Sequence, residues 1–170
     1  MKFDLDDSVP AIIQTYPREI VRGLAGHKCV LVSSMELPAE ATDIDRAWSG
    51  RQLPAAIRDL WLTTNRVYLL YKKDSRGLLI YDPVTSRRET DAVEDEQRIE
   101  DTGFHEDDVV MGDFQGYDSR LIYSPSDGWL VYNAITDRDD WTRLGDTLNN
   151  FLLVFRDVGG TSGDWERPFF

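Results

Sequence analysis

The chain has 170 residues, of which 41% are hydrophobic, and a formal net charge of -12 at pH 7. This length is typical of one domain with its own core, and the hydrophobic fraction argues against wholesale disorder. The acidic balance excludes a generic nucleic-acid binder, because the phosphate backbone would be repelled. The single Cys29 cannot form an intrachain disulfide, and no apolar stretch is as long as a membrane span. We therefore expect a soluble, cytoplasmic protein with no membrane segment.

The first 33 residues mix helix and strand signals. Residues 9–16 favour a short helix, which Pro17 interrupts. Pro17 also suits the first turn of a second helix over 17–26, whose apolar residues share one face and whose Gly26 follows the last turn. Residues 28–33 are typical of a short buried strand.

The middle of the chain has clearer patterns. The segment 38–50 predicts a short helix carrying Ala41, Ile44 and Trp48, and the apolar spacing in 53–65 predicts another helix, opened by Pro54 and stopped by Asn65. Two β-rich runs around Asp74–Gly77 predict a hairpin. The acidic stretch 86–108 lacks sustained periodicity and predicts a solvated loop, with a short helix around Val93–Ile99 as an alternative.

Strand signals return in the last third of the chain. Residues 109–111, 119–124 and 128–133 are rich in β-branched and aromatic residues, and Gly-containing turns separate them. These runs and the predicted helices permit an α+β architecture, a sheet with helices packed against it, in one domain.

The spacing over residues 144–156 predicts a final helix, with Asp146 as its N-cap. Its apolar stripe consists of Leu148, Phe151, Leu152 and Phe155. The domain is expected to span residues 1–156. A Gly-rich and aromatic tail, 157–170, is expected either to be disordered or to fold back through Trp165, Phe169 and Phe170.

Catalytic and metal patterns are weak. His27 and Cys29 would share a face of a strand, but a buried structural cysteine is far commoner than a nucleophile. In 105–108, His-Glu-Asp-Asp could be imagined as metal ligands, yet consecutive residues point in different directions and no second cluster has ligand spacing. The acidic run 137–140 lacks the glycine and closing glutamate of a calcium loop. We therefore assign no catalytic residue, cofactor or metal, and an enzyme would require a pocket that gathers His27, Cys29 or a carboxylate of raised pKa.

Acidic and aromatic residues are the better candidates for function. Residues 89–108 hold ten carboxylates against one arginine, and a charge concentration of this kind steers basic partners. Trp129 is as compatible with a core position as with an exposed anchor. The candidate partner contacts are Glu106, Asp107, Asp108, Asp118, Trp129, Asp137, Asp139 and Asp140.

Three segments carry a resemblance to a known family. LPAAIRDLWLTTN (53–65) resembles the Leu-Pro helix of the SUKH superfamily, and MGDFQGYDSRLIYSPSDGWLVYN (111–133) resembles its Gly-Asp turn and strand pair. LGDTLNNFLLVF (144–155), with Trp141 before it, resembles its closing strand and final helix. The resemblance covers roughly residues 50–156 and is weak over 1–49. It implies an α+β domain with a mostly antiparallel sheet.

The resemblance also implies a function. Bacterial SUKH proteins are largely immunity proteins encoded beside polymorphic or contact-dependent toxins, often nucleases or deaminases, and other members regulate cell-wall synthesis in eukaryotes. We therefore expect a non-enzymatic immunity protein that neutralises a cognate, basic toxin domain. A protein-interaction adaptor of the same fold is the alternative, and the sequence leaves the oligomeric state open.

Overall fold

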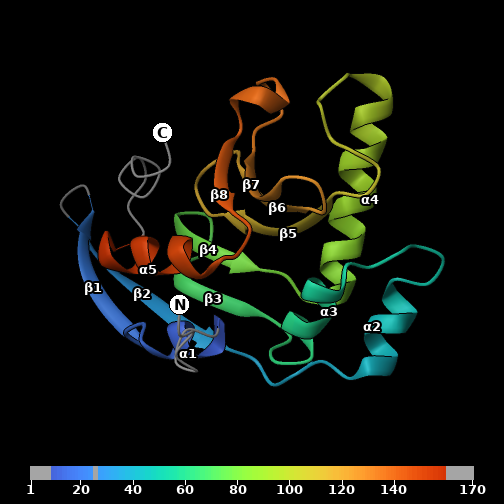
Figure 1. Ribbon diagram of the computed structural model, residues 1–170. Coiled ribbons are helices and arrows are strands. Elements are labelled where there is room, and N and C mark those ends of the chain that lie inside the picture. Colours follow the sequence, from blue (N-terminus) through green and yellow to red (C-terminus); the bar gives the residue numbers. More distant parts are fainter. Residues whose placement is uncertain (1–8, 25–26, 160–170) are drawn as a thin grey trace, which may run out of the picture.

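In the computed structural model, which describes residues 9–24 and 27–159, eight strands form one antiparallel sheet in chain order (Figure 1). The strands are β1 (Glu19–Leu24), β2 (His27–Met35), β3 (Val67–Lys72), β4 (Arg76–Ile80), β5 (Val109–Phe114), β6 (Arg120–Ser124), β7 (Gly128–Tyr132) and β8 (Thr142–Gly145). The helices in the same residues are α1 (Val9–Gln14), α2 (Ala41–Ala47), α3 (Ala55–Trp61), α4 (Pro83–Ile99), α5 (Asn149–Asp157) and the 3-10 helix η2 (Arg138–Asp140). The expected α+β fold with an antiparallel sheet is confirmed.

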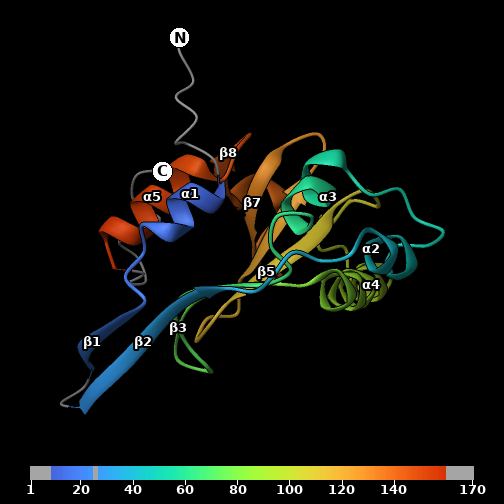
Figure 2. The same ribbon diagram turned by 90° about the horizontal axis from the view of Figure 1, so that it is seen from below.

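One face of the sheet carries the larger core. Helices α1, α3 and α5 cover it, and the predicted stripe of α5 is buried there (Figure 2). Trp61 of α3 is fully buried and donates a hydrogen bond from its indole nitrogen to the carbonyl oxygen of Tyr81 at 2.9 Å. The Tyr16 hydroxyl, after α1, donates to the Leu152 carbonyl at 2.5 Å, which joins the N-terminal segment to α5.

The opposite face of the sheet is covered over β4–β7 by α4 and the segments that follow it. A second apolar cluster forms there around Val93, Phe104 and Trp141. Alternation along the strands explains the two cores, since Trp129 and Val131 of β7 point to the first and its other apolar residues point to the second. The second cluster supports the candidate site described below.

Several sequence predictions are confirmed in place. The short helix after residue 8, the helices within 38–50 and 53–65, the hairpin around Asp74–Gly77 and the three strands after residue 108 are all present. The helix in 53–65 ends at Trp61, before the expected stop at Asn65. Strand β2 is longer than expected, and its residues alternate between buried and exposed.

The second helix expected over 17–26 is wrong. Residues Glu19–Leu24 form strand β1, and each of the six pairs with a residue of β2. Ile20 packs against the core while Val21 is 57% exposed, which is the alternation of a strand. The apolar spacing fits either structure, and the short connection to a second β-rich run decides for a hairpin.

The solvated loop expected over 86–108 is also wrong up to residue 99, because α4 runs for 17 residues from Pro83 to Ile99. The short helix considered around Val93–Ile99 is present as the end of α4. The buried side of α4 contains Ser86 and Thr90, so it has little hydropathy signal. Ser86 Oγ donates to the Val110 carbonyl at 2.6 Å, and Thr90 Oγ1 accepts from the Val110 backbone N–H at 3.0 Å. Hydrogen bonds to β5 therefore replace apolar packing on this side of the helix.

The N-terminus of α4 is capped by Asp82, whose carboxylate accepts hydrogen bonds from the backbone N–H groups of Val84 and Thr85 and also pairs with Arg66. Although burial opposes the effect, these partners hold the pKa of Asp82 below its usual range. Because the pKa of Asp82 is lower in the folded chain than in the unfolded chain, Asp82 contributes its whole stabilisation at a pH above the ordinary pKa of aspartate, near 4. This stabilisation is lost as the pH falls through the lower pKa of the folded chain.

We expect Asp82→Ala to lower the free energy of unfolding by about 1–3 kcal/mol at pH 7, because it removes the cap and leaves Arg66 without its carboxylate. Urea unfolding measured between pH 7 and pH 3 should show the difference from the unmodified chain shrinking toward the acid end. Asp95→Asn is the matched control, since Asp95 lies on the same helix with a side chain that is 73% exposed. An Asp82→Ala loss that is independent of pH contradicts the capping role.

The final helix begins later than expected. Residues Thr142–Gly145 form β8, paired with β7, and α5 starts at Asn149 with no side-chain cap, so the capping role expected for Asp146 is wrong. Gly145 has a φ of 108°, a conformation that favours glycine and turns the chain out of the sheet. Helix α5 ends at Asp157, and the expectations for Trp165, Phe169 and Phe170 lie outside the described residues.

Candidate functional site

Two consecutive segments and a third that is distant in sequence meet at the end of α4. They are the last turns of α4, the loop 101–108 and the connection 133–140 that contains η2, and Figure 1 shows α4 and this connection at the same end of the molecule. The side chain of Gln97 fixes the loop to the helix, since its Oε1 accepts from the Thr102 N–H at 2.8 Å and from the Phe104 N–H at 3.1 Å. Five exposed carboxylates, at the end of the loop and in or next to η2, make up what we term the acidic face: Glu106, Asp107, Asp137, Asp139 and Asp140.

Arg138 joins loop 101–108 to η2 from beneath the acidic face. Its side chain is only 12% exposed and forms ion pairs with Asp108 at 2.6 Å and Asp127 at 2.8 Å. It also donates to the Gly103 carbonyl at 3.0 Å and to Ser124 Oγ at 3.0 Å. Its guanidinium lies 5.1 Å from the centre of the Trp141 ring, which adds a cation–π contact.

The charges beneath the acidic face stabilise one another. Although burial opposes the effect, the carboxylates of Asp108 and Asp127 raise the pKa of Arg138 above its usual value. Hydrogen bonding to Arg138 in turn lowers the pKa of Asp127. The guanidinium therefore remains charged, and the loop and η2 keep their positions relative to each other.

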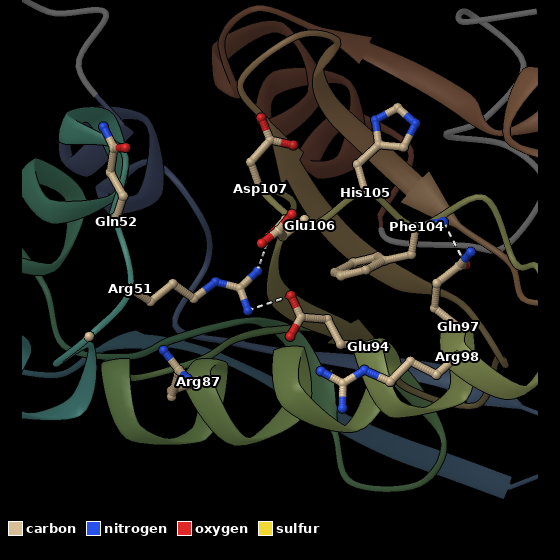
Figure 3. A pocket seen from close by; sticks show the side chains of 11 residues that line it. Arg51, Gln52, Arg87, Glu94, Gln97, Arg98, Phe104, His105, Glu106 and Asp107 are labelled. Carbon is tan, nitrogen blue, oxygen red and sulfur yellow. Dashed lines mark hydrogen bonds and ion pairs between the residues drawn. The ribbon is translucent and has the colours of Figure 1, made fainter.

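A second arginine closes the other side of the loop. Arg51 Nη2 donates to the backbone carbonyls of Glu106 at 2.5 Å and Asp108 at 3.2 Å, and Arg51 Nη1 pairs with Glu94 of α4 at 2.5 Å (Figure 3). Both contacts to the loop are to backbone atoms. The carboxylate of Glu106 is therefore not used by Arg51 and is available at the surface.

A cavity of about 600 Å³ opens between residues 50–52, α4 and loop 101–108. Its lining mixes both signs of charge: Arg51, Arg87 and Arg98 lie with Glu94, Glu106 and Asp107 around it (Figure 3). Two groups that an enzyme would need here, the thiol of Cys29 and a carboxylate of raised pKa, Asp113, are not among the residues that line this cavity.

Two large apolar side chains flank the acidic face and were not among the predicted contacts. Ile135, in the connection before η2, is 86% exposed, and Ile99, the last residue of α4, is 84% exposed. The backbone N–H of Ile135 donates to Asn133 Oδ1 at 3.1 Å, so its turn is held in place. Exposed isoleucines beside carboxylates allow the face to make apolar as well as electrostatic contacts with a partner protein.

The structure divides the predicted contact residues. Glu106, Asp107, Asp137, Asp139 and Asp140 are exposed and lie on connected segments. Asp118 is exposed in the β5–β6 turn and is not joined to them by a contact in the described residues. Asp108 is fully buried, so its expected surface position is wrong: its carboxylate is used internally by Arg138 and by the His105 backbone N–H. Trp129 is 5% exposed and packs against Tyr123. Of the two positions considered for it, Trp129 therefore occupies the core position and is not an exposed anchor.

His105, Asp107 and Asp108 converge more than consecutive residues were expected to. One potential ligand atom from each lies within 4.8 Å of the others. The expectation that they point apart is therefore wrong. However, both oxygens of Asp108 already bind the Arg138 guanidinium, at 3.2 and 2.6 Å, so a cation already neutralises this carboxylate. The geometry favours an internal ion pair over a metal centre.

Of the groups that an enzyme would require, Cys29 and a carboxylate of raised pKa, Asp113, make no contact with each other in the described residues, and the side chain of His27 lies outside them. Cys29 is 3% exposed and belongs to the larger core, as expected of a structural thiol. Asp113 of β5 is half-buried, and burial raises its pKa, but its carboxylate accepts a hydrogen bond from Gln115 Nε2 at 2.6 Å. The two residues belong to different environments of the sheet, and the structure gives no contact between them.

No protein-family model matched the chain, and no curated protein matched it. Within residues 9–24 and 27–159, no helix has both the length and the apolar character needed to cross a membrane.

Proposed function

We propose that this protein binds a basic partner protein through the acidic face. The observation that carries the proposal is the support of Glu106, Asp107, Asp137, Asp139 and Asp140 by two arginines, Arg51 and Arg138, that hold the backbone beneath them. Carboxylates on a preorganised backbone lose little conformational entropy on binding, so more of their electrostatic attraction is retained.

The partner we propose is a toxin domain, and the protein acts as its immunity protein. The resemblance of residues 50–156 to the SUKH superfamily supports this choice, together with the net charge of -12. A nuclease or deaminase toxin has a basic surface that holds phosphates, and exposed carboxylates can occupy the same arginines and lysines. In this proposal the protein works in the cytoplasm, where the toxin acts, without catalysis and without a cofactor.

Slow dissociation requires apolar contacts besides charge. Trp129 is in the core, so it does not provide them in the described arrangement. Ile99 and Ile135 are the better candidates, because both are more than four-fifths exposed and flank the acidic face. Apolar side chains surrounded by charged groups are typical of the energetic centres of protein interfaces.

The proposal is tested by co-expressing a candidate toxin domain, from a gene beside the one for this chain, with and without this protein. Protection by the unmodified chain is expected, and Ile99→Asp combined with Ile135→Asp is expected to weaken protection and to shorten the lifetime of the complex. Leu37→Asp is the matched control, since Leu37 is 85% exposed and lies before α2, distant in sequence from both Ile99 and Ile135. Equal killing with and without the unmodified chain rejects the immunity function for that pair.

An adaptor of the same fold is the second candidate. It is favoured by the open, mixed lining of the cavity beside the acidic face, which would accept a partner of either charge. A gene with no toxin-encoding neighbour, and a captured partner that is not basic, would support the adaptor over the immunity protein.

A further inference from the structure

The two edges of the sheet differ in how well they are protected from pairing. Strand β8 has only four residues, its register with β7 shifts, and it carries Arg143 with a side chain that is 61% exposed. Strand β1 has six residues that pair continuously with β2, with no proline and no register shift. Within the described residues β1 is the end of the sheet, so its outer backbone N–H and C=O groups have no strand beside them. A regular edge of this length is a template for another strand.

The sheet face around this edge is also open. On this face, helix α4 covers the other end of the sheet, over β4–β7, and Figure 2 shows the β1–β2 end extending past the helix. Three valines are exposed on the open part: Val21 at 57%, Val30 at 47% and Val32 at 41%. Val21 and Val30 are direct cross-strand partners, so they form an apolar row that ends at the edge of β1.

The β1–β2 region carries little of the chain's negative charge. Residues 17–32 contain Arg18, Arg22 and Lys28 against the single carboxylate of Glu19, in a chain whose overall charge is -12. Ten of the 31 acidic residues lie on α4 and the acidic face instead. Association through β1 therefore keeps the acidic parts of two copies apart.

We propose that two copies of this protein pair antiparallel through β1, about a two-fold axis normal to the sheet at Val21. Such an axis places residues of the same face opposite each other, and it makes the edge self-complementary. Centred on Val21, the pairing extends the row to four valines, Val30 and Val21 from each copy. The dimer would have one continuous sheet, with an acidic face at each end.

The charges select this register. With Val21 opposite Val21, Arg22 lies opposite Ile20 of the other copy. A shift that keeps the faces aligned places Arg22 opposite either Arg22 or Arg18 of the other copy. Like charges directly opposite each other destabilise a strand pair, so the register centred on Val21 is favoured.

The mass of the chain in solution tests the proposal. Light scattering and sedimentation over a concentration series should show a species of twice 19.5 kDa. Val21→Lys should raise the dimer dissociation constant by about tenfold or more, because two cations then meet on the axis. Val84→Lys is the matched control, since Val84 is 65% exposed on α4, and it should leave the dimer unchanged. A chain that stays monomeric up to about 100 μM, or a dimer insensitive to Val21→Lys, overturns the proposal.

Cross-linking tests the register independently of the immunity function. In a Cys29→Ala background, Val21→Cys should be linked between copies by a short bis-maleimide, because residues on the axis are about 5 Å apart. Val30→Cys is the control, since the two copies of residue 30 are three strand spacings, about 14 Å, apart. Efficient linking of Val21→Cys alone supports edge pairing. Linking at both positions indicates sheets stacked face to face, and linking at neither indicates no contact, and either result overturns the proposal.

Discussion

Arg138→Met is expected to lower the free energy of unfolding by about 3–5 kcal/mol, because it leaves a buried carboxylate without its counter-ion. Asp108 is fully buried, and both of its oxygens bind the Arg138 guanidinium. Methionine keeps an unbranched, apolar side chain over Trp141 but supplies no hydrogen-bond donor. The Gly103 carbonyl and Ser124 Oγ would lose the same donor, so the loss extends to the connection between loop 101–108 and η2.

Urea unfolding followed by tryptophan fluorescence measures this change. The double variant Arg138→Met with Asp108→Asn should recover part of the loss, since the buried group is then neutral. The unmodified chain, the two single variants and the double variant form a double-mutant cycle. Arg98→Met is the control: its pair with Asp95 is exposed, and the expected change is within about 0.5 kcal/mol. A loss below about 1 kcal/mol for Arg138→Met would mean that Asp108 is stabilised by other groups.

Elements with a hydropathy pattern could be predicted from the sequence. The helix that carries Ile57 and Trp61, the β3–β4 hairpin and the stripe of α5 each have periodicity that matches their burial. Helix α4 could not be found in this way, because its buried side contains Ser86 and Thr90. The signal it does carry is at its start, where Asp82 precedes Pro83 as an N-cap precedes a proline in the first turn.

Strand β1 was mispredicted for a different reason. The spacing of Ile20, Val21 and Leu24 fits a helix face as well as a strand, so local pattern alone does not decide. The deciding interactions lie outside the segment itself, since each residue of β1 gains a hairpin partner in β2 and Ile20 gains contacts in the core. Tertiary pairing of this kind overrides weak local preference.

For the candidate site, the sequence provided the acidic residues but not their support. The concentration of carboxylates is visible in the composition of residues 89–108, and five of the predicted contacts are exposed on the acidic face. Nothing in the sequence pairs Arg138 with Asp108, 30 residues away, or Arg51 with the Glu106 carbonyl, 55 residues away. The burial of Asp108 follows from the first pair, so a surface position could not be distinguished from a buried one by residue type.

Reversing the charge of Asp137, Asp139 and Asp140 to lysine is expected to slow association with a basic toxin domain by about 10- to 1,000-fold at low salt. All three carboxylates are exposed, and the neighbouring Arg138 keeps η2 in place, so the substitutions act on the surface field and not on the core. The effect should fall mainly on the association rate, because charges at the rim of an interface steer encounter more than they retain the complex.

Stopped-flow or surface-based kinetics with the toxin domain, repeated over a range of salt concentrations, measure this effect. The control is the same three-fold reversal at Glu40, Asp43 and Asp59, which are exposed on or beside α2 and α3. It changes the net charge equally, so a slower rate in both variants reports overall charge, and a slower rate in the first alone locates the steering at η2. An association rate that neither the η2 reversal nor salt changes would show that the acidic face does not guide the partner. Because the β1 edge lies on a different part of the sheet, this result does not depend on whether the protein is a dimer.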